Sequence, residues 1–236
     1  MGARRSTAAR TVRQVARSSP FSEVPRALCQ AVCESLAVDG ATFSLLTDTP
    51  SRQLLCASDA TALRLEEIQF TVAEGPCVTA AAEGVPVLME DLDADLARWP
   101  FFSASMSEQL PEVKAVYAFP LRMGEETLGS MDLLRREKGG LDAHAVRESQ
   151  HVADAVVEAL LSTLTELLNG SAPPAWEPAD VIRSHWSSTH QAIGVVAARL
   201  DISISDALAR MRAEAFRTGE TLAEVTAAVL RRRPRA

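Results

Sequence analysis

The residues best suited to chemistry in this 236-residue sequence are the arginines of its last quarter. Nine arginines and five acidic residues lie between residues 181 and 236, a net charge of +4. Arg210 and Arg217 share one face of an expected helix, Arg212 projects elsewhere, and Arg199 closes the helix before it. The planar guanidinium matches phosphate oxygens. These arginines therefore predict contact with a phosphate-bearing partner or, alternatively, pairing with acidic groups of the same chain.

Charge is distributed unevenly along the chain. Residues 21–180 carry ten Lys or Arg against 26 acidic residues, whereas residues 1–20 carry five arginines and no acid. An acidic body repels phosphate, so we expect any nucleic-acid contact at the ends of the chain.

Cysteine and histidine offer little for catalysis. Cys29 and Cys33 are four residues apart on one face of an expected helix, a spacing that could serve a metal site or a redox switch. No further Cys or His pair with ligand-like spacing accompanies them, so we expect buried, inert thiols, no metal site and no disulfide frame. The four histidines lie in no recognisable triad or phosphate loop, and we expect that the protein is not an enzyme.

The elements that position these residues follow from the pattern of apolar side chains. Residues 1–20 are polar and basic, which is typical of a disordered arm. Alternating apolar residues predict a hairpin over 41–57 and two more strands over 114–121 and 127–134, with helical pieces between them and an acidic, irregular segment over 90–111. This is an α+β pattern around an antiparallel sheet.

A long helix is expected over 141–168. It carries two apolar stripes, whereas packing against one surface needs only one. The second stripe favours a partner helix, and the alternative is a helix sunk more deeply in its own domain. We predict homodimerisation through Val156, Val157, Leu160, Leu161, Leu164 and Leu168. A proline-containing linker, 169–180, follows.

Residues 181–236 predict an all-α bundle of three helices. Capping-box pairs Ser203/Asp206 and Thr221/Glu224 begin the second and third helices, and Gly219 ends the second. The segments HQAIGVV (190–196), ALARMRAEAF (207–216), TG (218–219) and LAEV (222–225) resemble an ANTAR domain, a three-helix RNA-binding module of bacterial antitermination regulators.

Residues 21–168 resemble a GAF sensor domain, in particular that of actinobacterial GAF–ANTAR proteins. The fold that this resemblance implies is an antiparallel sheet flanked by helices, with room for a small-molecule ligand. No signature of cyclic-nucleotide or bilin binding is present, so the ligand or cofactor stays unknown. The segments that carry the resemblance are DGA (39–41), LEEIQFT (65–71), EGPC (74–77), PVL (86–88), RWP (98–100), AFPL (118–121) and LG (128–129).

Together the two resemblances imply an antiterminator that stabilises paired hairpins in nascent mRNA under control of the GAF domain. Because two hairpins call for two ANTAR domains, they also imply a homodimer. The expected RNA contacts are Gln191, Arg199, Arg210, Arg212, Arg217 and Thr218. Many ANTAR domains have Lys where this chain has Ile193, which favours one alternative: a signalling or protein-interaction module without RNA binding. A DNA-binding helix-turn-helix is the other.

The sequence also predicts where the protein acts. It contains no apolar run long enough to span a membrane and no secretion signal at Met1–Pro20. We therefore expect a cytoplasmic protein without a membrane partner.

Overall fold

The computed structural model describes residues 6–20, 23–46, 52–94, 96–169 and 180–231. The predicted linker, apart from its two ends, lies outside them. The elements, in chain order, are α1 (Thr7–Ser18), α2 (Val24–Leu36), β1 (Gly40–Leu46), β2 (Arg52–Ala57), α3 (Ala60–Val72), α4 (Pro76–Glu83), β3 (Val87–Met89), α5 (Pro100–Gln109), β4 (Ala115–Met123), β5 (Glu126–Arg135), α6 (Ala143–Asn169), α7 (Asp180–Leu200), α8 (Ile204–Thr218) and α9 (Leu222–Arg231).

Five strands form one antiparallel sheet in the order β2-β1-β5-β4-β3. The β1–β2 and β4–β5 hairpins are those that the alternating apolar pattern predicts. The α+β class with an antiparallel sheet is therefore confirmed.

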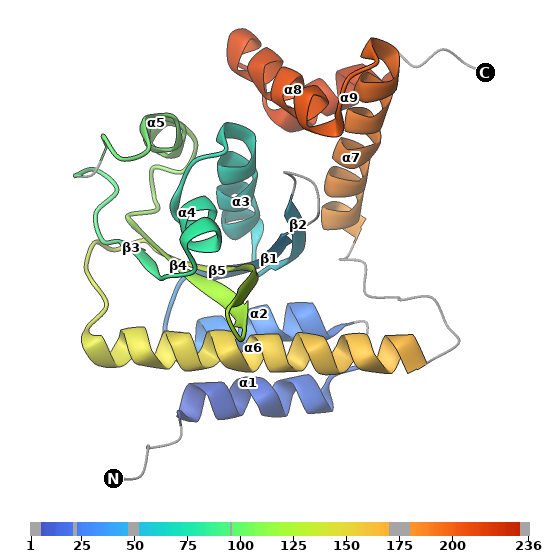
Figure 1. Cartoon of the computed structure of the whole chain (residues 1–236). Helices are drawn as coiled ribbons and strands as arrows, with labels where there is room; N and C mark the ends of the chain where they lie inside the picture. The colour runs from blue at the N-terminus through green and yellow to red at the C-terminus, as the bar shows by residue number, and fades with distance from the viewer. Residues whose placement is uncertain (1–5, 21–22, 47–51, 95, 170–179, 232–236) are drawn as a thin grey trace.

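Helices cover both faces of this sheet (Figure 1). On one face α1, α2 and α6 share a core with Met131 and Leu133 of β5. On the other face α3, α4 and α5 share a core with Leu134. Because successive side chains of a strand point to opposite faces, Asp132 points to the second face, among apolar residues. That orientation brings a carboxylate into the interior.

Helix α1 corrects the expectation of a disordered arm over residues 1–20. Thr7–Ser18 is helical and lies along α6, with Val12 fully buried (Figure 1). Arg13 Nε donates to Glu158 Oε2 at 2.6 Å, and this bond raises the pKa of Arg13 and lowers that of Glu158. The apolar side of α1 is made mostly of alanines, which a reading by large apolar residues does not register.

The double stripe of α6 has neighbours on both sides within one chain. Val156 and Val157 are buried in the core that α1, α2 and the sheet share, whereas Leu160 and Leu161 are half-buried at its edge. The two valines are therefore buried within one chain, in which α1 lies along α6. The side chains of Leu164 and Leu168 lie outside the described residues.

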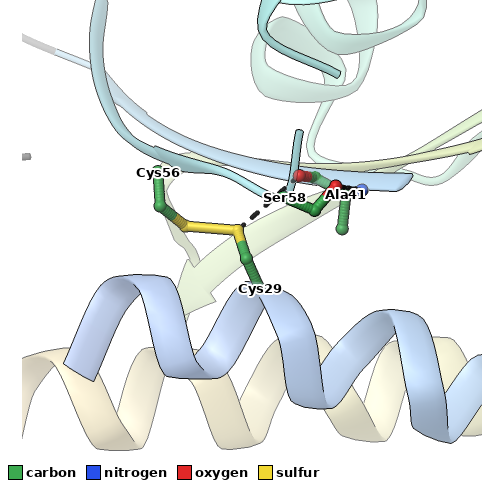
Figure 2. The surroundings of a disulfide bond; sticks show 4 residues. All are labelled: Cys29, Ala41, Cys56 and Ser58. Atoms are coloured by element: carbon green, nitrogen blue, oxygen red, sulfur yellow. Dashed lines mark hydrogen bonds between the residues drawn. A yellow bond between two sulfur atoms is a disulfide. The ribbon is translucent and has the colours of Figure 1, made fainter. Parts of the chain in front are cut away.

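Cys29 and Cys56 form a disulfide, which corrects the expectation of inert thiols (Figure 2). The bond ties α2 to the edge strand β2, with 6.7 Å between the two Cα atoms. Hairpin β1–β2 brings Cys56 over α2, a long-range contact that spacing alone does not show. Cys33 and Cys77 lie outside this disulfide. Cys33 is half-buried, and burial raises the pKa of its thiol, whereas Cys77 is buried.

Helix α5 lies in the segment that was expected to be irregular. Pro100 occupies its first turn, and Glu74 Oε2 accepts a hydrogen bond from the Phe101 amide at 3.0 Å. A distant carboxylate thus replaces a local cap, which is why the segment shows no start signal of its own.

Helices α7, α8 and α9 pack together as a bundle, as predicted. In the expected capping boxes, Ser203 Oγ accepts from the Asp206 amide at 3.0 Å, and the Thr221 amide donates to Glu224 Oε2 at 2.7 Å. Gly219 follows α8 in the left-handed conformation. Among the described residues, no helix combines the length and apolar composition that a membrane span requires.

Candidate functional site

Five of the six predicted RNA contacts lie on the exposed surface of the bundle: Gln191, Arg199, Arg210, Arg217 and Thr218. They come from α7 and α8. The sixth, Arg212, is half-buried. The structure thus brings most of the predicted set to the surface and directs one member elsewhere.

The last turn of α8 is tied by its own hydrogen bonds. Arg217 forms a bidentate pair with Glu214 at 2.9 and 2.7 Å, which raises the pKa of Arg217. The Thr218 hydroxyl donates to the Glu214 carbonyl at 2.9 Å. The side chains of Arg217 and Glu214 are 70% and 48% exposed, so solvent screens this ion pair. Arg217 can therefore exchange Glu214 for another anion at small cost.

Arg212 lies against the α+β part of the chain. Its Nε donates to the Phe70 carbonyl of α3 at 2.9 Å, and its guanidinium carbon lies 4.9 Å from the centre of the Phe70 ring. Nearby, Phe216 of α8 meets Phe101 of α5 edge-to-face, with ring centres 5.3 Å apart. Two contacts therefore join α8 to the helices above the sheet.

A cavity of about 460 Å³ lies at this junction. Ile68, Phe101 and Phe216 give it apolar walls. Its charged lining is of both signs, from Arg64, Arg212, Glu108 and Glu220. Its volume falls within the range of small-molecule sites. A molecule bound there would touch both α3 and α8.

A polar cluster lies inside the second core. Glu66 and Gln69 of α3, Cys77 of α4 and Asp132 of β5 are each at most 1% exposed. Gln69 Nε2 donates to Asp132 Oδ2 at 2.6 Å, and Gln69 Oε1 accepts from the Cys77 amide at 2.9 Å. The Cys77 thiol donates to Glu66 Oε2 at 3.8 Å. One donor atom each of Glu66, Cys77 and Asp132 lies within 4.8 Å of the others, a set that could hold a metal ion.

Gly75 makes this cluster possible. Its φ is +125°, and a Cβ there would lie 2.7 Å from Gln69 Oε1. The glycine lets the chain turn into α4 against Gln69, so that Cys77 arrives in the first turn of the helix.

Comparisons with known protein families and solved structures agree with this architecture. A sequence model of the GAF domain matches residues 18–161, and the chain therefore belongs to the GAF family. Members of this family are signalling and ligand-binding modules, so the α+β part of the chain is a sensor domain. No match was found among the curated proteins.

Solved GAF domains share the fold at low sequence identity. The GAF domain of a phosphoenolpyruvate-protein phosphotransferase from Acinetobacter is 12% identical, covers 70% of this chain and 98% of its own, and has a TM-score of 0.54. That of Coxiella burnetii is 12% identical over 67% of this chain and 94% of its own, with a TM-score of 0.53. Free methionine-R-sulfoxide reductase of Neisseria meningitidis is 12% identical over 67% and 89%, with a TM-score of 0.50.

The buried cluster is the feature that sequence reasoning missed. Its members lie in three elements separated by up to 66 residues, from Glu66 to Asp132, so no local spacing links them. One signal was available: Asp132 interrupts an otherwise apolar stretch of β5. A carboxylate at such a position needs a buried polar partner.

Proposed function

We propose that the protein is an RNA-binding transcription regulator. The bundle α7–α9 acts as an ANTAR domain that stabilises paired hairpins in nascent mRNA, and the GAF domain controls it. The protein binds RNA as a homodimer, one bundle to each hairpin. The mechanism contains no catalytic step.

The observation that carries the proposal is the exposure of Arg199, Arg210 and Arg217 on a bundle whose sequence resembles an ANTAR domain. RNA hairpin loops offer phosphates and unstacked bases to such side chains. The acidic charge of residues 21–180 directs an anionic partner towards the bundle and away from the GAF domain.

Ile193 bears on the main alternative, a bundle without RNA binding. This residue is 1% exposed and belongs to the bundle core. Its apolar character therefore serves packing, and the departure from Lys removes no cation from the exposed set.

The test measures binding of the full-length protein to a two-hairpin RNA by gel shift, with light scattering for stoichiometry. A single-hairpin RNA and duplex DNA serve as competitors. We expect a dimer on the paired hairpins, with a log–log salt slope of about −0.7 per phosphate contact. Preference for duplex DNA would favour the helix-turn-helix alternative, and no binding would favour the interaction module.

Charge reversal identifies the surface. The double variant Arg210→Glu/Arg217→Glu should lose at least about tenfold in RNA affinity, since charge-assisted hydrogen bonds are stronger than neutral ones and the new carboxylates repel phosphate. The matched control Arg122→Glu/Arg136→Glu changes two exposed arginines of the GAF domain and should bind like the wild type. Equal losses in the two variants would show a nonspecific charge effect and contradict the assigned surface.

A further inference from the structure

The buried cluster of Glu66, Cys77 and Asp132 contains the donor atoms of a metal site. Zinc is bound in proteins by thiolate sulfur and carboxylate oxygen, among other ligands. In a tetrahedral site, a sulfur at 2.3 Å and an oxygen at 2.0 Å from the ion lie about 3.5 Å apart. Cys77 Sγ lies 3.8 Å from Glu66 Oε2, and the three donor atoms lie within 4.8 Å of one another. Small side-chain movements would therefore close them around an ion.

Three separate elements hold these donors in place. Glu66 comes from α3, Cys77 from α4 and Asp132 from β5. Gln69 fixes two of them, because its amide donates to the Asp132 carboxylate and accepts from the Cys77 backbone. Such outer contacts orient metal ligands. The cluster therefore has both the donors and the second layer of a built site.

The charge of the cluster gives the physical reason for a cation. Two carboxyl groups and a thiol at most 1% exposed lie together in an apolar core. Burying ionised groups costs too much unless they take up protons, pair with cations or coordinate metals. Coordination of one divalent ion would neutralise all three groups at once.

We propose that Glu66, Cys77 and Asp132 bind one divalent metal ion, preferentially Zn²⁺, inside the GAF domain. In the metal-free form the Cys77 thiol donates to Glu66. On binding, the thiol releases its proton to solvent and sulfur bonds to the metal. Three protein ligands leave the fourth tetrahedral position for a water molecule or a small ligand.

The test uses Co²⁺ as a spectroscopic probe for Zn²⁺. The full-length protein is refolded with Co²⁺ under non-reducing conditions, because the site is buried, and free metal is then removed. We expect one Co²⁺ per chain, a near-ultraviolet thiolate-to-cobalt charge-transfer band, displacement by Zn²⁺ and a melting temperature raised by the metal. Less than stoichiometric metal, or cobalt without a charge-transfer band, would overturn the proposal.

Cysteine variants identify the residue that supplies the sulfur ligand. With Cys29 and Cys56 in a disulfide, Cys33 and Cys77 are the two cysteines that could supply a thiolate ligand. Cys33→Ser changes a half-buried side chain outside the cluster and should keep the band, whereas Cys77→Ser should lose it. Asp132→Asn should weaken binding at least tenfold while the circular dichroism spectrum stays unchanged.

The Cys33→Ser variant keeps the test decisive if Cys77→Ser does not fold. A band retained in Cys33→Ser comes from Cys77 and supports the site. A band lost there assigns the metal to Cys33 and refutes it. Because neither variant alters α7–α9, RNA binding can fail or succeed independently of this result.

Discussion

Gly75 shows at the scale of one residue how the interior of the GAF domain depends on the backbone. The residue has a φ of +125°, and Gln69 lies directly against the position that a Cβ would occupy. The resemblance of the segment EGPC (74–77), which contains this glycine, to a GAF domain was visible in the sequence. The packing of Gln69 and Asp132 behind it was not, because both partners are distant in sequence.

Gly75→Ala should therefore destabilise the protein strongly. The new Cβ would meet Gln69 and also Phe102 Cδ2 at 3.1 Å, in a backbone region that side chains rarely adopt. The matched control is Gly124→Ala, at a φ of +64° with nothing within 4 Å of its Cβ. In urea unfolding, Gly75→Ala should cost at least about 2 kcal/mol more than the control. Equal costs would mean that only backbone strain matters at Gly75.

At the scale of elements, large apolar residues and caps made most of the fold predictable. The strands, α6 and the bundle show clear periods or capping boxes. Helix α1 was not predicted because the side chains of its buried face are small. Helix α5 was not predicted because its cap comes from Glu74, which is distant in sequence. The disulfide was not predicted because Cys29 and Cys56 come together only when the β1–β2 hairpin packs on α2.

Burial rather than the ion pair should hold α1 on α6. Val12 is 0% exposed, so Val12→Ala should cost about 2 kcal/mol in the free energy of unfolding. Arg13→Ala removes a bond to Glu158, whose side chain is 60% exposed, and should cost at most about 1 kcal/mol. Urea unfolding of the two variants compares the contribution of burial with that of the ion pair to the free energy of unfolding. A larger loss for Arg13→Ala would show that the ion pair dominates.

The capping box of α9 predicts a pH dependence. Hydrogen bonds from the Thr221 amide and hydroxyl lower the pKa of Glu224. A carboxyl group with a lowered folded pKa contributes stability above its unfolded pKa and loses it as the pH falls through the folded pKa. Glu224→Gln should therefore be less stable than the wild type at neutral pH and equally stable at acidic pH.

Thermal unfolding at the two pH values measures this difference. The control Glu108→Gln changes an exposed acid on α5 and should show no such convergence. A difference between Glu224→Gln and wild type that persists in acid would mean that charge at Glu224 does not strengthen the cap.

At the scale of the whole molecule, the bundle and the GAF domain share a core. Leu54 of β2 and Phe70 of α3 are buried together with Leu208 and Met211 of α8. A three-helix unit of this size is marginal alone. The GAF domain therefore supports the bundle, and a change at their junction can reach the surface proposed to bind RNA.

The pair Phe101–Phe216 tests this junction, since each ring comes from one side of it. In a double-mutant cycle of the two alanine variants, we expect a coupling of about 0.5–1.5 kcal/mol. Hydrogen exchange of the α8 amides in the full-length protein gives the opening free energies. Phe216 is 72% exposed, so its removal leaves the bundle core intact.

A second cycle supplies the control for that coupling. Val85→Ala changes an exposed residue that lies outside the lining of the cavity, and its effect should add to that of Phe216→Ala within about 0.5 kcal/mol. Coupling confined to Phe101–Phe216 would establish that α8 rests on α5 in solution. Coupling near zero in both cycles would mean that the bundle moves independently of the GAF domain, and control of RNA binding would then have to pass through the dimer instead.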